Sequence, residues 1–260
     1  MKRPSDGPRR YLTLALFLLG IGAIWQVVCT LNVLPGYSLP TPAAVLGRLG
    51  ELARDGSLWV STRASLIRMA LGFTVAAALG LLVGLTMGVV PVISRGLRSL
   101  FLGIQTLPSA AWVPIALLLF GLGDGAIYFV IVMSSTAAMA IATADAVATV
   151  PPVYLRVARN LGAGTVEIGA KVMLPAALPG IITGLKLGWT LAWHGVVSAE
   201  LIKSTVGIGF LLHMGRELND AAQVVAVMLV TIAIGIALDH LLFSWVERRV
   251  RARWGLEPAS

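Results

Sequence analysis

Lys186, His194 and Glu200 are the ionisable side chains of an otherwise apolar stretch, residues 178–201. The histidine could donate hydrogen bonds to an anion, or it could satisfy a neighbouring carbonyl. On one helix Lys186 and Glu200 would project about 40° apart and lie about 21 Å apart along the axis, too far to pair. We therefore expect no compact three-residue site, a structural Lys186 and a structural or gating Glu200. A lone acid there would repel an anion unless it were neutralised.

The motifs that would make this chain an enzyme are absent from the sequence. It has no G-x-x-x-x-G-K-[ST] loop, no Cys/His cluster with metal spacing, no H-E-x-x-H and no G-x-S-x-G elbow. His194 and His213 stand apart from any acid–base–nucleophile set, and the single Cys29 allows no internal disulfide. We expect no catalytic residues and no metal site, so energy from ATP would have to come from another subunit.

The composition indicates which class of protein, and which kind of helix, positions the ionisable residues. Apolar residues make up 57% of the 260, and only 12% are charged, about half of the 25% typical of a soluble domain. The mean hydropathy is +0.88. A soluble enzyme, a disordered chain and a fibrous repeat are excluded, which leaves an all-α polytopic membrane protein. The net charge of +8 comes from basic residues at the ends and in short connections, which indicates topology rather than nucleic-acid binding.

Charge-free runs predict six transmembrane helices. The first run is too long for a signal peptide and has no A-x-A cleavage site. Before the second span, Thr41, Pro42 and Gly56 favour a short interfacial helix over about 42–55. The predicted spans are 11–33, 66–91, 99–121, 125–147, 176–202 and 221–246.

An even number of spans places both termini on one side of the membrane. On this model 13 Lys and Arg residues fall on that side and 6 on the other. The positive-inside rule then places both ends and the 148–175 loop in the cytoplasm. The predicted organisation is a cytoplasmic N-terminus (1–10), a single membrane domain (11–250, core 60–246) and a cytoplasmic C-terminal tail (251–260).

Prolines interrupt the third predicted span at Pro108 and Pro114. Proline frees backbone groups that protein or water must satisfy. The segment could be a kinked or broken helix beside a pathway, or a kink required only by packing. Trp112, between the two prolines, is a candidate pathway or gate residue.

The predicted cytoplasmic loop reads TVPPVYLRVARNLGAGTVEIGAKVMLPAALPGI. Its prolines favour a helix from about 151 to Asn160, and Leu161-Gly162-Ala163-Gly164 should end it. Thr165 could cap a second short helix, which Leu174-Pro175 would end at the turn into the fifth span. Such a loop could dock a cytoplasmic partner or lie on the membrane as an amphipathic connector.

This loop resembles the "EAA" loop of permease subunits of bacterial binding-protein-dependent ABC importers. The family pattern is E-A-A, three residues, glycine, about nine variable residues, an apolar residue, any residue and L-P. The resemblance extends over about 39–250, and LPTPAAVL, LLLFGLGD and LKLGWTLAWHGVVSAELI are similar to the alkanesulfonate, taurine and nitrate branch. The implied ATPase-coupling residues are Arg156, Val157, Ala158, Leu161, Gly162, Ala163, Leu174 and Pro175.

The resemblance implies a multi-pass permease of the bacterial inner membrane that works by alternating access. Its implied partners are two copies of an ABC ATPase, a second and usually identical permease, an extracytoplasmic substrate-binding protein and the lipid bilayer. No cofactor is expected in this chain, and ATP and Mg would be on the ATPase. The implied solute is a small organic or inorganic anion. The alternatives are a self-contained secondary transporter or channel and, more distantly, a membrane enzyme using His194 and Glu200.

Two positions depart from the family pattern. Arg156 stands where the family has glutamate, so either the ATPase carries a matching change or the acid is dispensable. Asp145 stands near the cytoplasmic end of the fourth span, where related sequences tend to be small and uncharged. It could be a snorkelled or paired acid, or a gate or coupling contact.

Overall fold

The computed structural model describes residues 7–31, 39–202 and 205–243, and these segments form helices without a β-strand. The predicted tail (251–260) and the first six residues lie outside the described part. The α-helices are α1 (Gly7–Thr30), α2 (Pro42–Arg54), α3 (Ser57–Val89), α4 (Pro91–Gln105), α5 (Val113–Phe120), α6 (Asp124–Ala148), α7 (Pro152–Asn160), α8 (Thr165–Ile168), α9 (Leu174–Ile202), α10 (Ile208–Glu217) and α11 (Ala221–Leu238). A 3-10 turn, η1 (Ser109–Trp112), and two π-helical segments, η2 (Gly169–Met173) and η3 (Asp239–Phe243), complete the chain.

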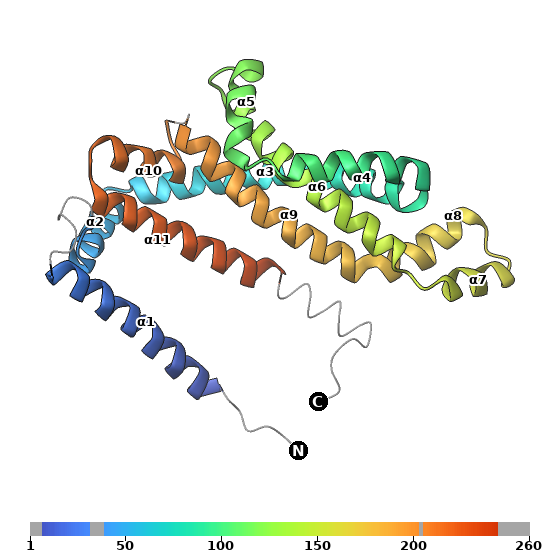
Figure 1. Cartoon of the computed structure of the whole chain (residues 1–260), viewed down its shortest axis with the longest axis horizontal. Coiled ribbons are helices and arrows are strands. Elements are labelled where there is room, and N and C mark those ends of the chain that lie inside the picture. Colours follow the sequence, from blue (N-terminus) through green and yellow to red (C-terminus); the bar gives the residue numbers. More distant parts are fainter. Residues whose placement is uncertain (1–6, 32–38, 203–204, 244–260) are drawn as a thin grey trace.

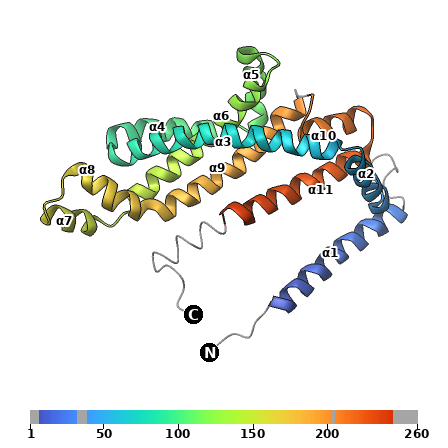
Figure 2. The same cartoon turned by 180° about the vertical axis from the view of Figure 1, so that it is seen from behind.

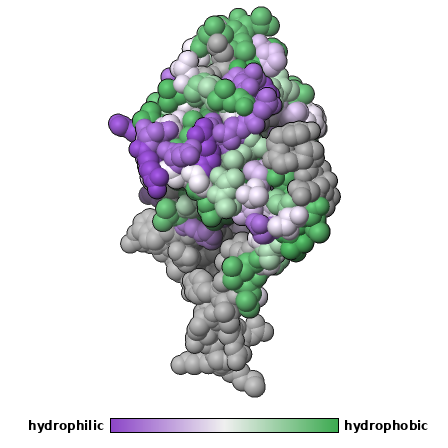
Figure 3. Space-filling model, turned by 90° about the vertical axis from the view of Figure 1, so that its left-hand side faces the viewer, coloured by the Kyte–Doolittle hydropathy of each residue, from purple (hydrophilic) through white to green (hydrophobic). Residues whose placement is uncertain are grey.

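Helices α3, α6 and α9 run side by side and form the centre of an elongated bundle (Figures 1 and 2). Helices α2 and α10 lie at one end, and α7 and α8 lie at the other. Hydrophilic residues gather on the end that carries α2 and α10, whereas much of the surface around them is apolar (Figure 3). This distribution fits a bundle that crosses a bilayer and has a polar end at the membrane surface.

Small residues bring α3 and α6 into close contact. Gly72, Ala76, Gly80 and Gly84 recur every fourth position on α3 and are buried. Residues four apart share a helix face, so this stripe forms one groove along α3, and it packs against residues of α6. Small side chains let helix backbones approach closely in lipid, where packing replaces the hydrophobic effect.

Helix α2 confirms the short helix predicted before the second span. Thr41 Oγ accepts a hydrogen bond from the Ala44 N–H at 3.2 Å, and Pro42 occupies the first turn. Gly56, at φ +80°, joins α2 to α3. The second span was predicted too short at its N-terminal side, because α3 begins at Ser57 rather than at residue 66. Arg63 therefore lies inside a helix and not in a connection.

The third predicted span is broken. Helix α4 and the segment Ser109–Phe120 meet at an angle of 100°, so α5 projects away from the bundle (Figure 1). Pro108 is extended at ψ 148°, and it has no N–H to continue α4. Pro114 breaks nothing, because it lies in the first turn of α5, where the missing N–H needs no partner.

Four described helices are long and apolar enough to cross a membrane, and a fifth span results if the bent pair counts as one. They are Ser57–Val89, Asp124–Ala148, Thr165–Ile202 and Ala221–Leu241. Helix α1 covers most of the first predicted span, and Leu19–Thr30 within it is apolar. The count of six spans stays a prediction, as do the proposed domain limits.

Gly84→Ala tests the α3–α6 contact. A Cβ at Gly84 would lie 2.6 Å from the Ala140 carbonyl oxygen and 2.6 Å from Thr143 Cβ. Because backbone cannot move aside locally, we expect the free energy of unfolding to fall by about 1–3 kcal/mol. Gly103→Ala is the control, since a Cβ there meets nothing within 4 Å. Urea unfolding of both variants in detergent measures the difference, and equal midpoints would contradict the expectation.

Candidate functional site

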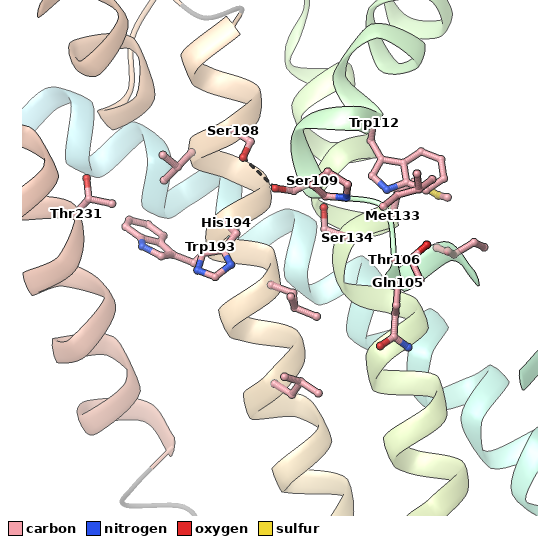
Figure 4. A pocket seen from close by; sticks show the side chains of 16 residues that line it. Gln105, Thr106, Ser109, Trp112, Met133, Ser134, Trp193, His194, Ser198 and Thr231 are labelled. Atoms are coloured by element: carbon pink, nitrogen blue, oxygen red, sulfur yellow. Dashed lines mark hydrogen bonds between the residues drawn. The ribbon is translucent and has the colours of Figure 1, made fainter. Parts of the chain in front are cut away.

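A cavity of about 670 Å³ lies where η1, α6 and α9 meet (Figure 4). The break between α4 and α5 forms one wall, because Leu107, Pro108 and Ser109 all line it. Pro108 therefore marks a broken helix beside a cavity, and Pro114 does not. The lining residues are Ile104, Gln105, Thr106, Leu107, Pro108, Ser109, Trp112, Met133, Ser134, Leu187, Leu191, Trp193, His194, Val197, Ser198 and Thr231.

One face of α9 supplies the far wall. Leu187, Leu191, His194 and Ser198 follow one another at spacings of four, three and four residues, which places them on a common helix face. The face changes from apolar to polar along its length. His194 is exposed to the cavity, and Ser198 lies one turn further towards the end of the helix.

Serine hydroxyl groups line the cavity from three elements, η1, α6 and α9. Ser109 Oγ on η1 and Ser198 Oγ on α9 are 2.9 Å apart and share a hydrogen bond. On α6, Ser134 Oγ donates to the Val130 carbonyl at 2.6 Å, so it presents only acceptor lone pairs. The Ser109–Ser198 pair is the direct polar contact between the broken span and α9.

Two tryptophans border the cavity. Trp112 packs edge-on against Phe129, with ring centroids 6.4 Å apart. Trp193 is buried, and with His194 and Thr231 it also lines a second cavity of about 450 Å³ between α9 and α11. The ring of Trp193 extends from α9 towards Thr231 in Figure 4.

Glu200 is at the centre of a buried polar network near the end of α9. Its side chain is fully buried, and its Oε2 accepts from Ser65 Oγ at 2.6 Å and from the Gly209 N–H at 3.1 Å. Arg68 Nη1 lies 3.0 Å from Oε1, and Arg68 Nη2 lies 2.9 Å from Asp124 Oδ1. Glu200 is therefore not a lone acid, because Arg68 on α3 supplies its counter-charge, and these contacts support a structural role for it.

The other candidate charges also have partners. Lys186 Nζ lies 3.0 Å from Asp239 Oδ2 on η3, and Asp145 pairs with Arg98. These pairs support a structural role for Lys186 and identify Asp145 as a paired acid. Of the five pathway candidates, the structure brings only Trp112 and His194 together in the cavity.

A second polar cluster lies at the end of the bundle that carries α2 and α10, and it joins α2 to the start of α11. Arg48 donates to Glu51 at 2.7 Å and to Gln223 at 2.7 Å, and its Nε lies 2.9 Å from Asp220. The hydrogen bond to Glu51 is the largest influence that raises the pKa of the Arg48 guanidinium. Gln223 in turn donates to the Leu211 carbonyl at 2.9 Å, which ties α10 to the same cluster.

The predicted coupling loop forms the opposite end of the bundle. Helix α7 ends in a Schellman motif: the Gly162 N–H donates to the Arg159 carbonyl and the Ala163 N–H to the Ala158 carbonyl, both at 3.0 Å. Gly162 has φ +84°, a left-handed conformation that favours glycine. Ala158 packs inside, whereas Leu161 is 82% exposed. The predicted helix and its glycine break are confirmed.

The second half of the loop differs from its prediction. Thr165 does not cap α8, because Gly164 holds the N-cap position without a side-chain bond. Leu174 and Pro175 end no helix, since Thr165–Ile202 is continuous through the π-helical η2. A π turn shifts the backbone hydrogen bonds from i−4 to i−5, and this irregularity accommodates the N–H that Pro175 lacks.

Several residues of the site were not identified from the sequence. Asp124 ends the segment LLLFGLGD, which was noted only for the family resemblance, and Arg68 was not proposed as a partner of Glu200. The charge of Arg68 and the hydroxyl of Ser65, three residues earlier on the same helix face, were the available signals. No sequence pattern distinguished the cavity serines Ser109, Ser134 and Ser198 from structural ones, because serine in a membrane helix commonly donates a hydrogen bond to the backbone of its own helix.

A helical bundle with apolar surfaces, a cavity lined partly by polar side chains and an exposed helix–turn–helix loop at one end fits the membrane subunit of a transporter. The chain belongs to the family of binding-protein-dependent transport system inner membrane components, whose model matches residues 76–252. It is therefore a permease subunit of an ABC importer, and the alternative of a self-contained transporter is set aside.

Relatives of known role agree with this family. The chain is 32% identical over 247 residues to the taurine transport system permease protein TauC of Escherichia coli (strain K12), covering 93% of this chain and 90% of that protein. It is 34% identical over 243 residues to the bicarbonate transport system permease protein CmpB of Synechococcus elongatus, covering 89% and 86%. It is 29% identical over 228 residues to the nitrate import permease protein NrtB of a Synechocystis species, covering 84% and 82%.

A solved structure shares the fold. The inward-facing MetNI methionine ABC transporter contains a chain that superposes with a TM-score of 0.61 at 18% identity, covering 74% of this chain and 97% of that one. At this identity the likeness shows the fold alone.

Arg68→Ala tests the network around Glu200. Removing one partner of a buried pair leaves an uncompensated charge, so we expect the free energy of unfolding to fall by about 3–5 kcal/mol. Adding Glu200→Gln should recover part of this loss, because a neutral amide needs no counter-charge. Thermal unfolding in lipid nanodiscs measures both effects.

Arg63→Ala is the matched control for this cycle, since Arg63 is exposed on the same helix. We expect it to leave the unfolding midpoint nearly unchanged. A double variant no more stable than Arg68→Ala alone would show that Glu200 does not depend on Arg68 for neutralisation.

Proposed function

We propose that this chain works with a separate ABC ATPase, whose movements it receives through α7 and α8. The observation that carries the proposal is the loop surface at the end of the bundle opposite α2 and α10. Val157 is 50% exposed there, Leu161 82% and Val166 85%. Exposed apolar side chains beside charged ones are typical of a surface that a partner covers.

The proposed coupling surface comprises the residues of the family motif. Arg156, Val157 and Leu161 face outward on α7, and Ala158 holds the helix against the loop. Gly162 and Ala163 form the turn, and Leu174 and Pro175 begin α9. Arg156, in place of the family glutamate, would require a complementary acid in the ATPase groove or a groove that needs no charge there.

The proposed assembly contains two ATPase subunits, a second permease and an extracytoplasmic binding protein. ATP and Mg would bind the ATPase, which would carry out hydrolysis, and this chain would hold no cofactor. Both termini and the α7–α8 loop would face the cytoplasm, in agreement with the 13 to 6 distribution of Lys and Arg. The second permease would be a copy of this chain.

The proposed solute is a small oxyanion. Relatives at about 30% identity carry the names of taurine, bicarbonate and nitrate transport. Each of these solutes has a compact sulfonate, carboxylate-like or nitrate group. The binding protein would select among them, and this chain would carry whichever is delivered.

Affinity purification of the chain from native membranes in mild detergent tests the assembly. We expect a P-loop ATPase to co-purify at about one copy per permease, because the α7–α8 surface is apolar enough to hold it. Mass spectrometry of the eluate measures this. A chain recovered alone and active in uptake without ATP would overturn the proposal.

Gly162→Ala tests coupling through the loop. Alanine at φ +84° is strained by about 1–2 kcal/mol, so we expect ATP-driven uptake to fall about ten-fold with normal membrane insertion. Gly164→Ala is the matched control, because Gly164 has φ −72° and both positions have open space for a Cβ. Uptake into vesicles containing the purified assembly measures the effect. Equal uptake by the two variants would show that the left-handed turn is not needed.

A further inference from the structure

The lining of the cavity between η1, α6 and α9 is mostly apolar, with a set of neutral polar side chains and His194, and it contains no aspartate, glutamate, lysine or arginine. The charges nearest in sequence are occupied elsewhere: Glu200 with Arg68, and Lys186 with Asp239. An ion inside this cavity would therefore meet neither a strong counter-ion nor a repelling carboxylate. Neutral hydrogen-bonding groups are left as the source of recognition.

The lining offers several hydrogen-bond donors that have no partner among the described residues. In the Ser109–Ser198 pair one hydroxyl donates to the other, so the second hydroxyl hydrogen is free for a ligand. Imidazole carries at least one N–H in any protonation state, and His194 has no hydrogen-bond partner in the described part of the chain. The Gln105 amide and the Trp112 indole add further N–H groups to the lining.

Other hydroxyls of the lining are already committed as donors. Thr106 Oγ donates to the Gly103 carbonyl at 2.7 Å, and Thr231 Oγ donates to the Val227 carbonyl at 2.7 Å. The spare donors thus come from α4, η1 and α9, on both sides of the cavity. Figure 4 shows the Ser109–Ser198 pair in the same cavity as His194.

We propose that this cavity is a transit site for a small oxyanion, which accepts hydrogen bonds from His194 and from the Ser109–Ser198 pair. The inference rests on the proposed function, because it takes the solute through this chain. Oxyanion oxygens are acceptors only, which matches a lining of spare donors. The absence of a fixed lysine or arginine makes binding weak, and a site on a pathway must release its ion as readily as it accepts it.

Histidine-selective isotope labelling gives a direct test. The chain has three histidines, so the labelled protein in nanodiscs has few imidazole signals, and His194→Gln and His213→Gln assign them. The probe is sodium methanesulfonate, titrated at constant pH and ionic strength. We expect the His194 signal to shift and to saturate in the millimolar range, while the His213 signal stays in place.

Matched serine variants locate the donors. Combining Ser109→Ala with Ser198→Ala removes the spare hydroxyl, and we expect half-saturation of the His194 shift to need about ten-fold more probe. Ser135→Ala is the control, because Ser135 is buried next to Ser134, bonds the Ile131 carbonyl and does not line the cavity. It should leave the titration unchanged.

Three results would overturn the transit site: a His194 shift that stays linear without saturation, an equal shift with sodium chloride, or an unchanged titration in the double serine variant. Failure of the importer proposal has a different signature. If the chain worked without an ATPase, the Gly162→Ala comparison would fail and the His194 titration would still saturate. If the titration failed while the ATPase co-purified, only the transit site would be wrong.

Discussion

A buried carboxylate determines how α3, α9 and the start of α10 meet. Glu200 has no exposed side-chain surface, and an unpaired charge at such a place would destabilise the protein by several kcal/mol. Its counter-charge comes from Arg68 and its hydrogen bonds from Ser65 and the Gly209 backbone. Ser65 also accepts from the Ile208 N–H at 2.9 Å. The position of the end of α9 therefore depends on its contacts with α3 and with the start of α10.

The same constraint explains where charge is found in the bundle. In the described part of the chain, each ion pair joins two elements or lies within one turn of a helix, and the pair of Arg68 with Asp124 extends the Glu200 network to the start of α6. Lys186 and Asp239 tie α9 to the segment after α11 in the same way. With these charges paired elsewhere, the cavity wall consists of apolar side chains, hydroxyl groups, the Gln105 amide and His194. The hydrogen-bonding groups of this wall are therefore neutral side chains and His194, and not the charged pairs.

Local chemistry was predictable from sequence, and contacts over long separations were not. Pro42 and the Gly162 turn were anticipated because capping and left-handed glycine depend on a few neighbouring residues. The pairing of Arg68 with Glu200 spans 132 residues, and no helical periodicity connects positions so far apart. Pro175 was misread because proline usually ends a helix, whereas a π turn lets this helix continue. The cavity depends on how three helices pack, which no single segment encodes.

The continuous helix Thr165–Ile202 links the loop to the cavity. It has 38 residues, so at about 1.5 Å per residue it is about 57 Å long. It begins beside α7, carries His194 and Ser198 on its cavity face, and ends near Glu200. Its π-helical segment, η2, lies at the loop end, and Pro179 lies inside the helix between η2 and the cavity. Proline removes one i−4 hydrogen bond from a helix and favours a bend, so η2 and Pro179 are the two places where this helix can bend most easily. In the proposed coupling, a displacement of α7 and α8 would pass through both places before it reached the cavity. Among the described residues, Ser109–Ser198 is the side-chain hydrogen bond that joins the broken span to the cavity face of α9, so it is the polar contact that such a movement would change.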